Sequence, residues 1–276
     1  MDSLSPAEQY LQDFHTRVAG ATSAAFGGYP ASMAHVAYAS SYAVLASRVE
    51  AAPNVRTVLD LACGDGHLLG LFVNDPRPIR LIGVDMSAGE LELARTRLPA
   101  DVTLIRERAQ ALSLPTESVD YVLSHMALML MNDVDQVIRE IRRVLISGGG
   151  FAAMVGRTFL LGEVFDVFLD TFRPIAKEDL APLPMGDRRT RTTEGWTDLL
   201  RNDFDDIEFN DVDVAWRPQP EALWRSLCET YDVDRLTEGA RTRLKTAFLA
   251  AIEPLREADG SLSTGWGLRL IQGRAR

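Results

Sequence analysis

Between Arg56 and Gly156 the sequence alternates short apolar runs with amphipathic ones, and this alternation constrains the fold more than any other feature. The strand-like runs are Thr57–Ala62, Ile79–Asp85, Val102–Arg106, Val119–His125 and Phe151–Gly156. The helical runs between them are Gly66–Val73, Ala88–Leu98 and Val134–Leu145. Because strands that alternate with helices need crossover connections, the pattern predicts a parallel sheet with helices on both faces.

The rest of the chain is expected to extend this core on both sides. Residues 1–52 predict an N-terminal helical lid, with one helix opening at the capping box Ser5-Pro6-Ala7-Glu8 and a second over Ala31–Ala51. Residues 53–156 form the core. Residues 157–276 complete the sheet and add helical insertions that cap the substrate; their late strands are Ile207–Trp216 and Gly265–Gln272. The expected fold is a doubly wound, Rossmann-like, mostly parallel seven-stranded sheet that binds ligands at the carboxyl ends of its strands.

Charge and cysteine content exclude several classes of function. The formal net charge of −10 opposes binding to a phosphate backbone, so we expect no nucleic-acid partner. Two distant cysteines, Cys63 and Cys228, predict neither a disulfide framework nor a metal site. The chain starts without a basic, then apolar leader, and its most apolar run, Met126–Met131, is shorter than the roughly 20 residues that cross a bilayer. We therefore expect a cytoplasmic protein with no membrane partner.

The first strand leads into a glycine turn that carries most of the functional signal. Leu59-Asp60-Leu61-Ala62-Cys63-Gly64-Asp65-Gly66 ends a strand in an acid, turns through two glycines and enters a helix. Dinucleotide-binding turns share this outline, but their spacing puts glycine where this chain has Leu69. Asp65 would also repel a pyrophosphate. Two aspartates, Asp60 and Asp65, instead favour a cationic ligand, by about 1 to 4 kcal/mol for each close pair.

The second strand ends in another acid, Asp85, followed by Met86. An acid about 20 residues after the glycine turn is spaced to accept both hydroxyls of a ribose. The apolar side chain of Met86 is suited to cover the face of an adenine. Together the two strand ends indicate a nucleoside ligand that carries positive charge.

These motifs resemble those of the class I S-adenosylmethionine-dependent methyltransferases, in particular the small-molecule group with a UbiE-like core. The resemblance covers roughly residues 55–156. It includes the glycine turn and Val84-Asp85-Met86-Ser87, and continues through Ala109–Pro115, Ser118–Ser124 and Ile141–Leu145 to the glycines at 148–150.

The resemblance implies S-adenosylmethionine as cofactor and assigns positions around it. Asp60, Ala62, Gly64 and Gly66 would surround the methionine part, Asp85 would hold the ribose, and Met86, Ala109 and Gln110 would contact the adenine. Ser124 and His125 would lie beneath the reacting methyl group. Apart from the resemblance, Tyr38 and Tyr42 of the N-terminal region could reach the cofactor carboxylate or close a lid, and packing in the core is the alternative. The family often has an acid directly before Ala109 that accepts from the adenine amine, whereas this chain has Arg108, and Gln110 could replace that acid through its amide.

The expected reaction is methyl transfer by in-line displacement to a small, apolar or aromatic metabolite, because the insertions that would build the acceptor pocket are rich in phenylalanine and tryptophan. His125, with an ordinary pKa of about 6.5, is the candidate general base; hydrogen bonding to the cofactor is the alternative. His15 and His35 are either structural or in contact with the substrate. A pathway protein that binds the cofactor without transferring methyl groups, such as a cyclase or decarboxylase, and a peptide or protein methyltransferase are the alternative functions.

Overall fold

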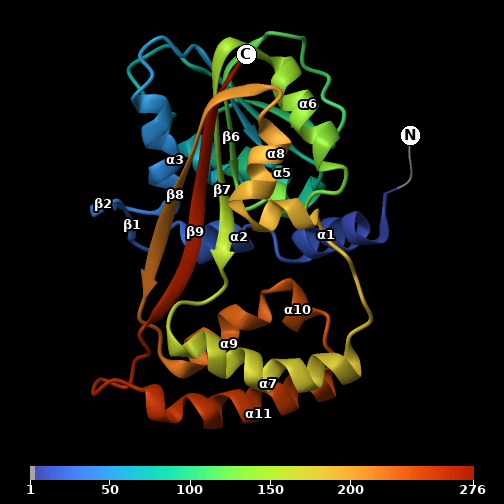
Figure 1. Ribbon diagram of the computed structural model, residues 1–276, viewed down its shortest axis with the longest axis vertical. Helices are drawn as coiled ribbons and strands as arrows, with labels where there is room; N and C mark the ends of the chain where they lie inside the picture. The colour runs from blue at the N-terminus through green and yellow to red at the C-terminus, as the bar shows by residue number, and fades with distance from the viewer. Residues whose placement is uncertain (1–3) are drawn as a thin grey trace.

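The computed structural model describes residues 4–276, so the first three residues of the expected lid lie outside it. Residues 4–276 form one nine-stranded sheet covered by helices, with a helical cap at one end (Figure 1). The strand order is β2-β1-β8-β9-β7-β6-β3-β4-β5. The strands are β1 (Ala31–Met33), β2 (Val36–Tyr38), β3 (Thr57–Leu61), β4 (Arg80–Asp85), β5 (Thr103–Arg106), β6 (Val119–His125), β7 (Leu145–Thr158), β8 (Phe204–Trp216) and β9 (Thr264–Ala275).

Five of these strands form the parallel half of the sheet, which the alternating pattern predicted. Strands β7, β6, β3, β4 and β5 are parallel neighbours in that order. The helices that cross between them are α4 (His67–Gly70), α5 (Ala88–Arg97) and α6 (Val134–Val144). Strands β3, β4 and β6 are buried on both faces along most of their length, as expected where helices cover both sides of a sheet, whereas the edge strand β5 is only half-buried. Their carboxyl ends therefore meet at one edge, where the functional motifs follow β3, β4 and β6.

The prediction of seven strands and of one helix over Ala31–Ala51 is wrong. The segment forms the hairpin β1–β2, with Ala34 and His35 at positive φ in its two-residue turn, and then helix α3 (Ser41–Glu50), capped by Ser40. Strand β1 pairs with β8. Helix propensity alone favours a helix here, but the free backbone groups along β8 offer hydrogen bonds that only a strand can make.

The two late strands were predicted, and both are longer than expected. Strand β9 runs antiparallel between β7 and β8, and it joins the parallel half of the sheet to the antiparallel half. The sheet is therefore mixed, with four strands outside the parallel set.

Helices after β7 form a cap with an apolar core of its own. The cap helices are α7 (Glu163–Asp179), α9 (Pro220–Cys228), α10 (Tyr231–Asp234) and α11 (Glu238–Ile252), grouped below the sheet in Figure 1. Leu223, Leu244 and Phe248 are among the residues buried between them. Helix α8 (Thr193–Leu200) instead packs on the sheet through Trp196. Short 3₁₀ turns cover Leu128–Leu130, Arg188–Arg191 and Glu253–Leu255.

The N-terminal helices lie between the sheet and the cap. Helix α1 (Pro6–Arg17) has the predicted capping box: Ser5 Oγ accepts from the Glu8 amide, and the Glu8 carboxylate accepts from the Ser5 amide. Helix α2 (Ala21–Phe26) follows after the left-handed Gly20. None of the helices in residues 4–276 combines the length and apolar composition needed to span a bilayer.

Candidate active site

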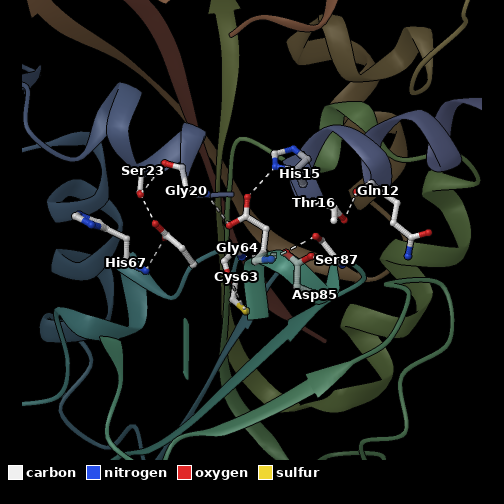
Figure 2. Close-up of polar contacts among 12 residues, drawn as sticks. Gln12, His15, Thr16, Gly20, Ser23, Cys63, Gly64, His67, Asp85 and Ser87 are labelled. Atoms are coloured by element: carbon white, nitrogen blue, oxygen red, sulfur yellow. Dashed lines mark hydrogen bonds and ion pairs between the residues drawn. The ribbon is translucent and has the colours of Figure 1, made fainter. Parts of the chain in front are cut away.

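A cavity of about 1050 Å³, its open mouth included, lies at the carboxyl ends of the parallel strands. Its walls come from the residues that follow β3, β4, β5 and β6, from α1 and α2, and from Tyr231 of the cap. Figure 2 shows part of this wall, with the turn at Cys63 and Gly64 beside Asp85 and Ser87, and His15, Gly20 and Ser23 of the N-terminal segment opposite. Eight of the predicted site residues line it: Asp60, Ala62, Gly64, Asp85, Met86, Ala109, Gln110 and His125.

Three predicted site residues are not part of the cavity wall. Gly66 has φ +77°, and a Cβ on it would lie 2.5 Å from Leu98 Cδ1, so this glycine permits the close packing of the turn against the end of α5. The hydroxyl of Ser124 is buried and donates to the Leu61 carbonyl oxygen at 2.8 Å, which joins β6 to β3. Tyr38 ends β2 and packs against the apolar core beneath the hairpin. A contact between these three residues and the cofactor stays a prediction.

The glycine turn and the end of β4 are joined through Asp85. One carboxylate oxygen of Asp85 accepts from the Gly64 amide at 2.9 Å, and the other accepts from the Ser87 amide at 2.8 Å. Burial raises the pKa of Asp85, although these two donors favour its charged form. Because a carboxylate oxygen has two lone pairs, each oxygen of Asp85 can still accept one hydroxyl. The carboxylate is therefore suited to a vicinal diol, such as that of a ribose.

Asp60, at the end of β3, is an acid that no basic side chain or hydrogen-bond donor of the described residues contacts. Its side chain is 1% exposed, lines the cavity, and has no hydrogen-bond partner among residues 4–276. Burial, together with the negative charges of Asp85 and Asp65, raises the pKa of Asp60 well above its ordinary value. An ammonium group placed in the cavity would supply both the missing charge and the missing hydrogen bonds.

Asp65 does not act as the second free acid that the sequence predicted. Its carboxylate is buried, forms an ion pair with Arg97 of α5, and accepts from the Ser23 hydroxyl of α2. Its other oxygen accepts from the His67 amide at 3.2 Å. Arg97 therefore matches the charge of Asp65 within the protein. The prediction that Asp65 presents its charge to a ligand is wrong, because the sequence does not reveal this partner on α5.

His125 lines the cavity but has an unusual environment for a general base. Its ring stacks on Tyr42 at 3.7 Å between centroids, and Nε2 lies 2.9 Å from Ser41 Oγ. Burial, with a smaller contribution from the nearby His67, lowers the pKa of His125 to about 3. The ring is therefore neutral at neutral pH, and the assumption of an ordinary pKa near 6.5 is wrong. Nδ1 is buried with no partner among the described residues, and is free to hydrogen-bond a ligand.

One chain of polar contacts across the cavity was missed from the sequence. The buried carboxylate of Glu90 contacts His15 Nδ1 at 2.8 Å and accepts from the Gly20 amide at 3.0 Å. His15 Nε2 in turn lies 3.0 Å from the Tyr231 hydroxyl. Sequence analysis left His15 open between a structural role and contact with the substrate. These contacts join the core, through Glu90, to the N-terminal segment, through His15 and Gly20, and to the cap, through Tyr231.

The aromatic residues of the insertions do not line the cavity. Phe168 and Trp224 are buried within the cap, and Phe159, Phe165 and Phe172 pack against the same cluster. Of the described residues after 156, only Tyr231 lines the cavity. The expectation of a pocket built from the aromatic insertions is therefore wrong for these residues. The apolar part of the wall comes instead from Leu11, Met126, Ala127, Leu130 and Met131.

Comparison with known proteins shows that part of this chain is similar to methyltransferases. Residues 59–153 match a family model described as a methyltransferase domain. The malonyl-[acyl-carrier protein] O-methyltransferase of Methylococcus capsulatus is 37% identical over 102 residues, which are 36% of this chain and 37% of that protein. The demethylmenaquinone methyltransferase of Symbiobacterium thermophilum is 33% identical over 129 residues, 43% of this chain and 51% of that protein.

These matches therefore cover 37% and 51% of the relatives' own lengths. Among solved structures, the YcgJ protein of Bacillus subtilis has a TM-score of 0.56 at 19% identity, covering 84% of this chain and 97% of that one. That likeness shows a shared fold. The family match covers the segment that supplies Asp60, the glycine turn, Asp85 and His125, so these residues lie in the part of the chain that is similar to known methyltransferases.

Proposed function

We propose that this protein transfers a methyl group from S-adenosylmethionine to a small acceptor molecule with an apolar surface. The observation that carries the proposal is the pair of strand-end acids on the cavity wall. Asp60 lacks a partner, and Asp85 keeps one lone pair on each oxygen. A nucleoside with a positively charged side arm satisfies both, whereas a pyrophosphate would meet their negative charge.

Three parts of the cofactor would each contact a group on the wall. In this proposal Asp60 binds the ammonium group, Asp85 accepts the ribose hydroxyls, and Met86 and Ala109 contact the adenine. The cofactor supplies a methyl group on a sulfonium, which is already a good leaving group. The protein therefore has to bind, orient and exclude water, for which the covering helix α1 and the apolar wall are suited.

The neutral ring of His125 fits orientation better than proton removal. Its Nδ1 can make one hydrogen bond to the cofactor or to the acceptor, while Ser41 and Tyr42 hold the ring in place. An acceptor that must lose a proton would need a stronger base than this imidazole.

The acceptor is proposed to be small and partly apolar because of the wall that Leu11, Met126 and Leu130 form. The relatives named above are, by their names, methyltransferases of demethylmenaquinone and of malonyl-[acyl-carrier protein]. We favour a small-molecule acceptor, and treat a peptide acceptor or a reaction without methyl transfer as outcomes of the test.

The test first measures cofactor binding and then measures methyl transfer. Calorimetry with S-adenosylmethionine and S-adenosylhomocysteine is expected to show one site per chain, and NADH is expected not to bind. Incubation with methyl-labelled cofactor and a metabolite extract should then move label into a small molecule. Failure to bind either nucleoside would refute the proposal. Binding without any transfer would favour a cyclase or decarboxylase of the same fold.

A further inference from the structure

A ring of polar contacts surrounds the end of the cavity next to β5. Arg108, directly after this strand's end, donates from Nε to Glu8 Oε1 at 3.1 Å and forms an ion pair with Glu8 through Nη2. Glu8 Oε2 accepts from the Ser5 amide at 2.9 Å. The Ser5 hydroxyl accepts from Asn132 Nδ2 at 2.7 Å, and the Asn132 carbonyl oxygen accepts from Gln110 Nε2 at 2.9 Å. The ring closes because Arg108 and Gln110 are separated by one residue.

This ring holds an acid from α1 beside the strand end where Ala109 lies. Glu8 is 6% exposed and lines the cavity together with Ala109 and Gln110. The Arg108 guanidinium is directed at Glu8, so it fastens α1 to the core. An acid that is distant in sequence is thereby brought to this end of the cavity.

The contacts leave Glu8 able to accept one further hydrogen bond. The two Arg108 donors occupy Oε1, and the Ser5 amide occupies one of the two lone pairs of Oε2. One lone pair of Oε2 remains. Gln110 can add its amide oxygen, because its Nε2 is already used by the Asn132 carbonyl.

We infer that Glu8 is the specificity-determining residue for the purine base, accepting a hydrogen bond from the exocyclic amine of an adenine. The inference rests on the proposed function, since it requires a nucleoside in the cavity. Arg108 acts on the base only through Glu8 and is a positioning residue. Because Glu8 belongs to α1, the helix that lines this side of the cavity would also contact the base.

A pair of ligands that differ at one position of the base tests this role. S-adenosylhomocysteine has an amine at the six position of its purine, and S-inosylhomocysteine has a carbonyl oxygen there. A carboxylate favours the amine and repels the oxygen. The ratio of the two dissociation constants, measured by calorimetry, therefore reports the group that faces this position and needs no turnover.

Glu8→Gln is the decisive variant, because a capping box accepts glutamine in place of glutamate and the helix start is kept. It is expected to lower the preference for the adenosyl ligand by about 10-fold to 100-fold, the range for a hydrogen bond to a charged group. Glu107→Gln is the matched control. Glu107 also lines the cavity, but its carboxylate accepts from the Ser113 amide at 2.9 Å, and this variant should leave the preference unchanged.

The outcomes separate the inference from a purely structural role. A Glu8→Gln variant that weakens both ligands equally, or neither, would overturn the inference, because a capping role alone does not distinguish the two bases. A loss of preference in Glu107→Gln would overturn it as well, by assigning the contact to Glu107. Melting curves of both variants check that the fold is kept. If the wild-type protein binds neither ligand, the proposed function itself fails.

Discussion

Replacing Asp60 by asparagine is expected to make the ligand-free protein more stable and the ligand-bound protein less so. The side chain is 1% exposed, has no hydrogen-bond partner among the described residues, and lies near the negative charges of Asp85 and Asp65. Each of these conditions disfavours the charged carboxylate in the folded protein. Asparagine keeps the shape of the side chain and removes the charge, so the Asp60→Asn variant tests the electrostatic argument directly.

The sign of the pH dependence follows from the raised pKa of Asp60. Below the unfolded-state pKa of about 3.9, both states are protonated and Asp60 affects stability little. As the pH rises above this value, the unfolded chain ionises while the folded chain keeps its proton, so the free energy of unfolding falls until the folded-state pKa is reached. The stability advantage of Asp60→Asn should therefore be near zero at about pH 4 and grow toward higher pH.

The expected size is about 1 to 3 kcal/mol at about pH 8, because each pH unit between the unfolded-state pKa and the folded-state pKa of Asp60 costs about 1.4 kcal/mol. For a chain of this length that is a rise of about 2 to 8 °C in Tm. Affinity for S-adenosylhomocysteine should fall by about 10-fold to 100-fold, because its ammonium loses a charged partner. Binding to the wild-type protein should also release a proton, measurable by calorimetry in buffers of different ionisation enthalpy.

Asp85→Asn is the matched comparison, at the end of the neighbouring strand. Asp85 accepts from two backbone amides, and an asparagine would turn its own NH₂ toward one of these donors. We expect it to destabilise the ligand-free protein by about 1 to 3 kcal/mol, opposite in sign to Asp60→Asn. If Asp60→Asn melts below the wild-type protein at about pH 8, or binds the ligand as tightly, the electrostatic reasoning is refuted.

Three further expectations concern residues whose roles the structure changed. In thermal melts, Gly66→Ala should lower the free energy of unfolding by about 2 to 4 kcal/mol, because the residue has positive φ and its new Cβ would clash with Leu98. Gly70→Ala should leave the free energy of unfolding unchanged, because its Cβ would lie 3.9 Å from its nearest neighbour. The ring of His125 should stay neutral between about pH 5 and pH 8, and an NMR titration with a midpoint in that range would contradict its burial. In denaturant titrations, Asp65→Asn should lower the free energy of unfolding by about 1 to 2 kcal/mol, because it breaks the partly exposed ion pair with Arg97. An unchanged unfolding midpoint would argue against that ion pair.

Local patterns predicted the parallel half of the sheet well. Val119–His125 forms a strand with the predicted bounds, and the capping box at Ser5 begins α1 as expected. In both cases the information lies within a few residues: apolar spacing in the strand and paired side chains at the cap. Prediction failed at Ala31–Ala51, where the strand β1 forms because β8, nearly two hundred residues later, offers it a pairing edge. That information is absent from the local sequence.

The site was predicted in the same uneven way. Residues after strand ends, such as Asp60 and Asp85, lie on the cavity wall because the topology of a parallel sheet brings them there. Gly66 does not line the cavity, and a glycine needed for packing looks the same in sequence as a glycine needed for a ligand. Its actual constraint is Leu98, at the far end of α5.

The charge that the cavity presents is determined by residues outside the methyltransferase motifs. Among the acids on the wall, Glu8 is matched by Arg108, Asp65 by Arg97 and Ser23, and Glu90 by His15 and the Gly20 amide. Each of these three acids lies on α1 or has at least one partner on α1, α2 or the turn between them. Asp85 and Glu107 accept from backbone amides of the core, and Asp60 has no hydrogen-bond partner among the described residues. A chain with the same strand-end motifs but a different N-terminal segment would expose a different set of acids, so the motifs place the acids while the N-terminal segment decides which of them a ligand meets.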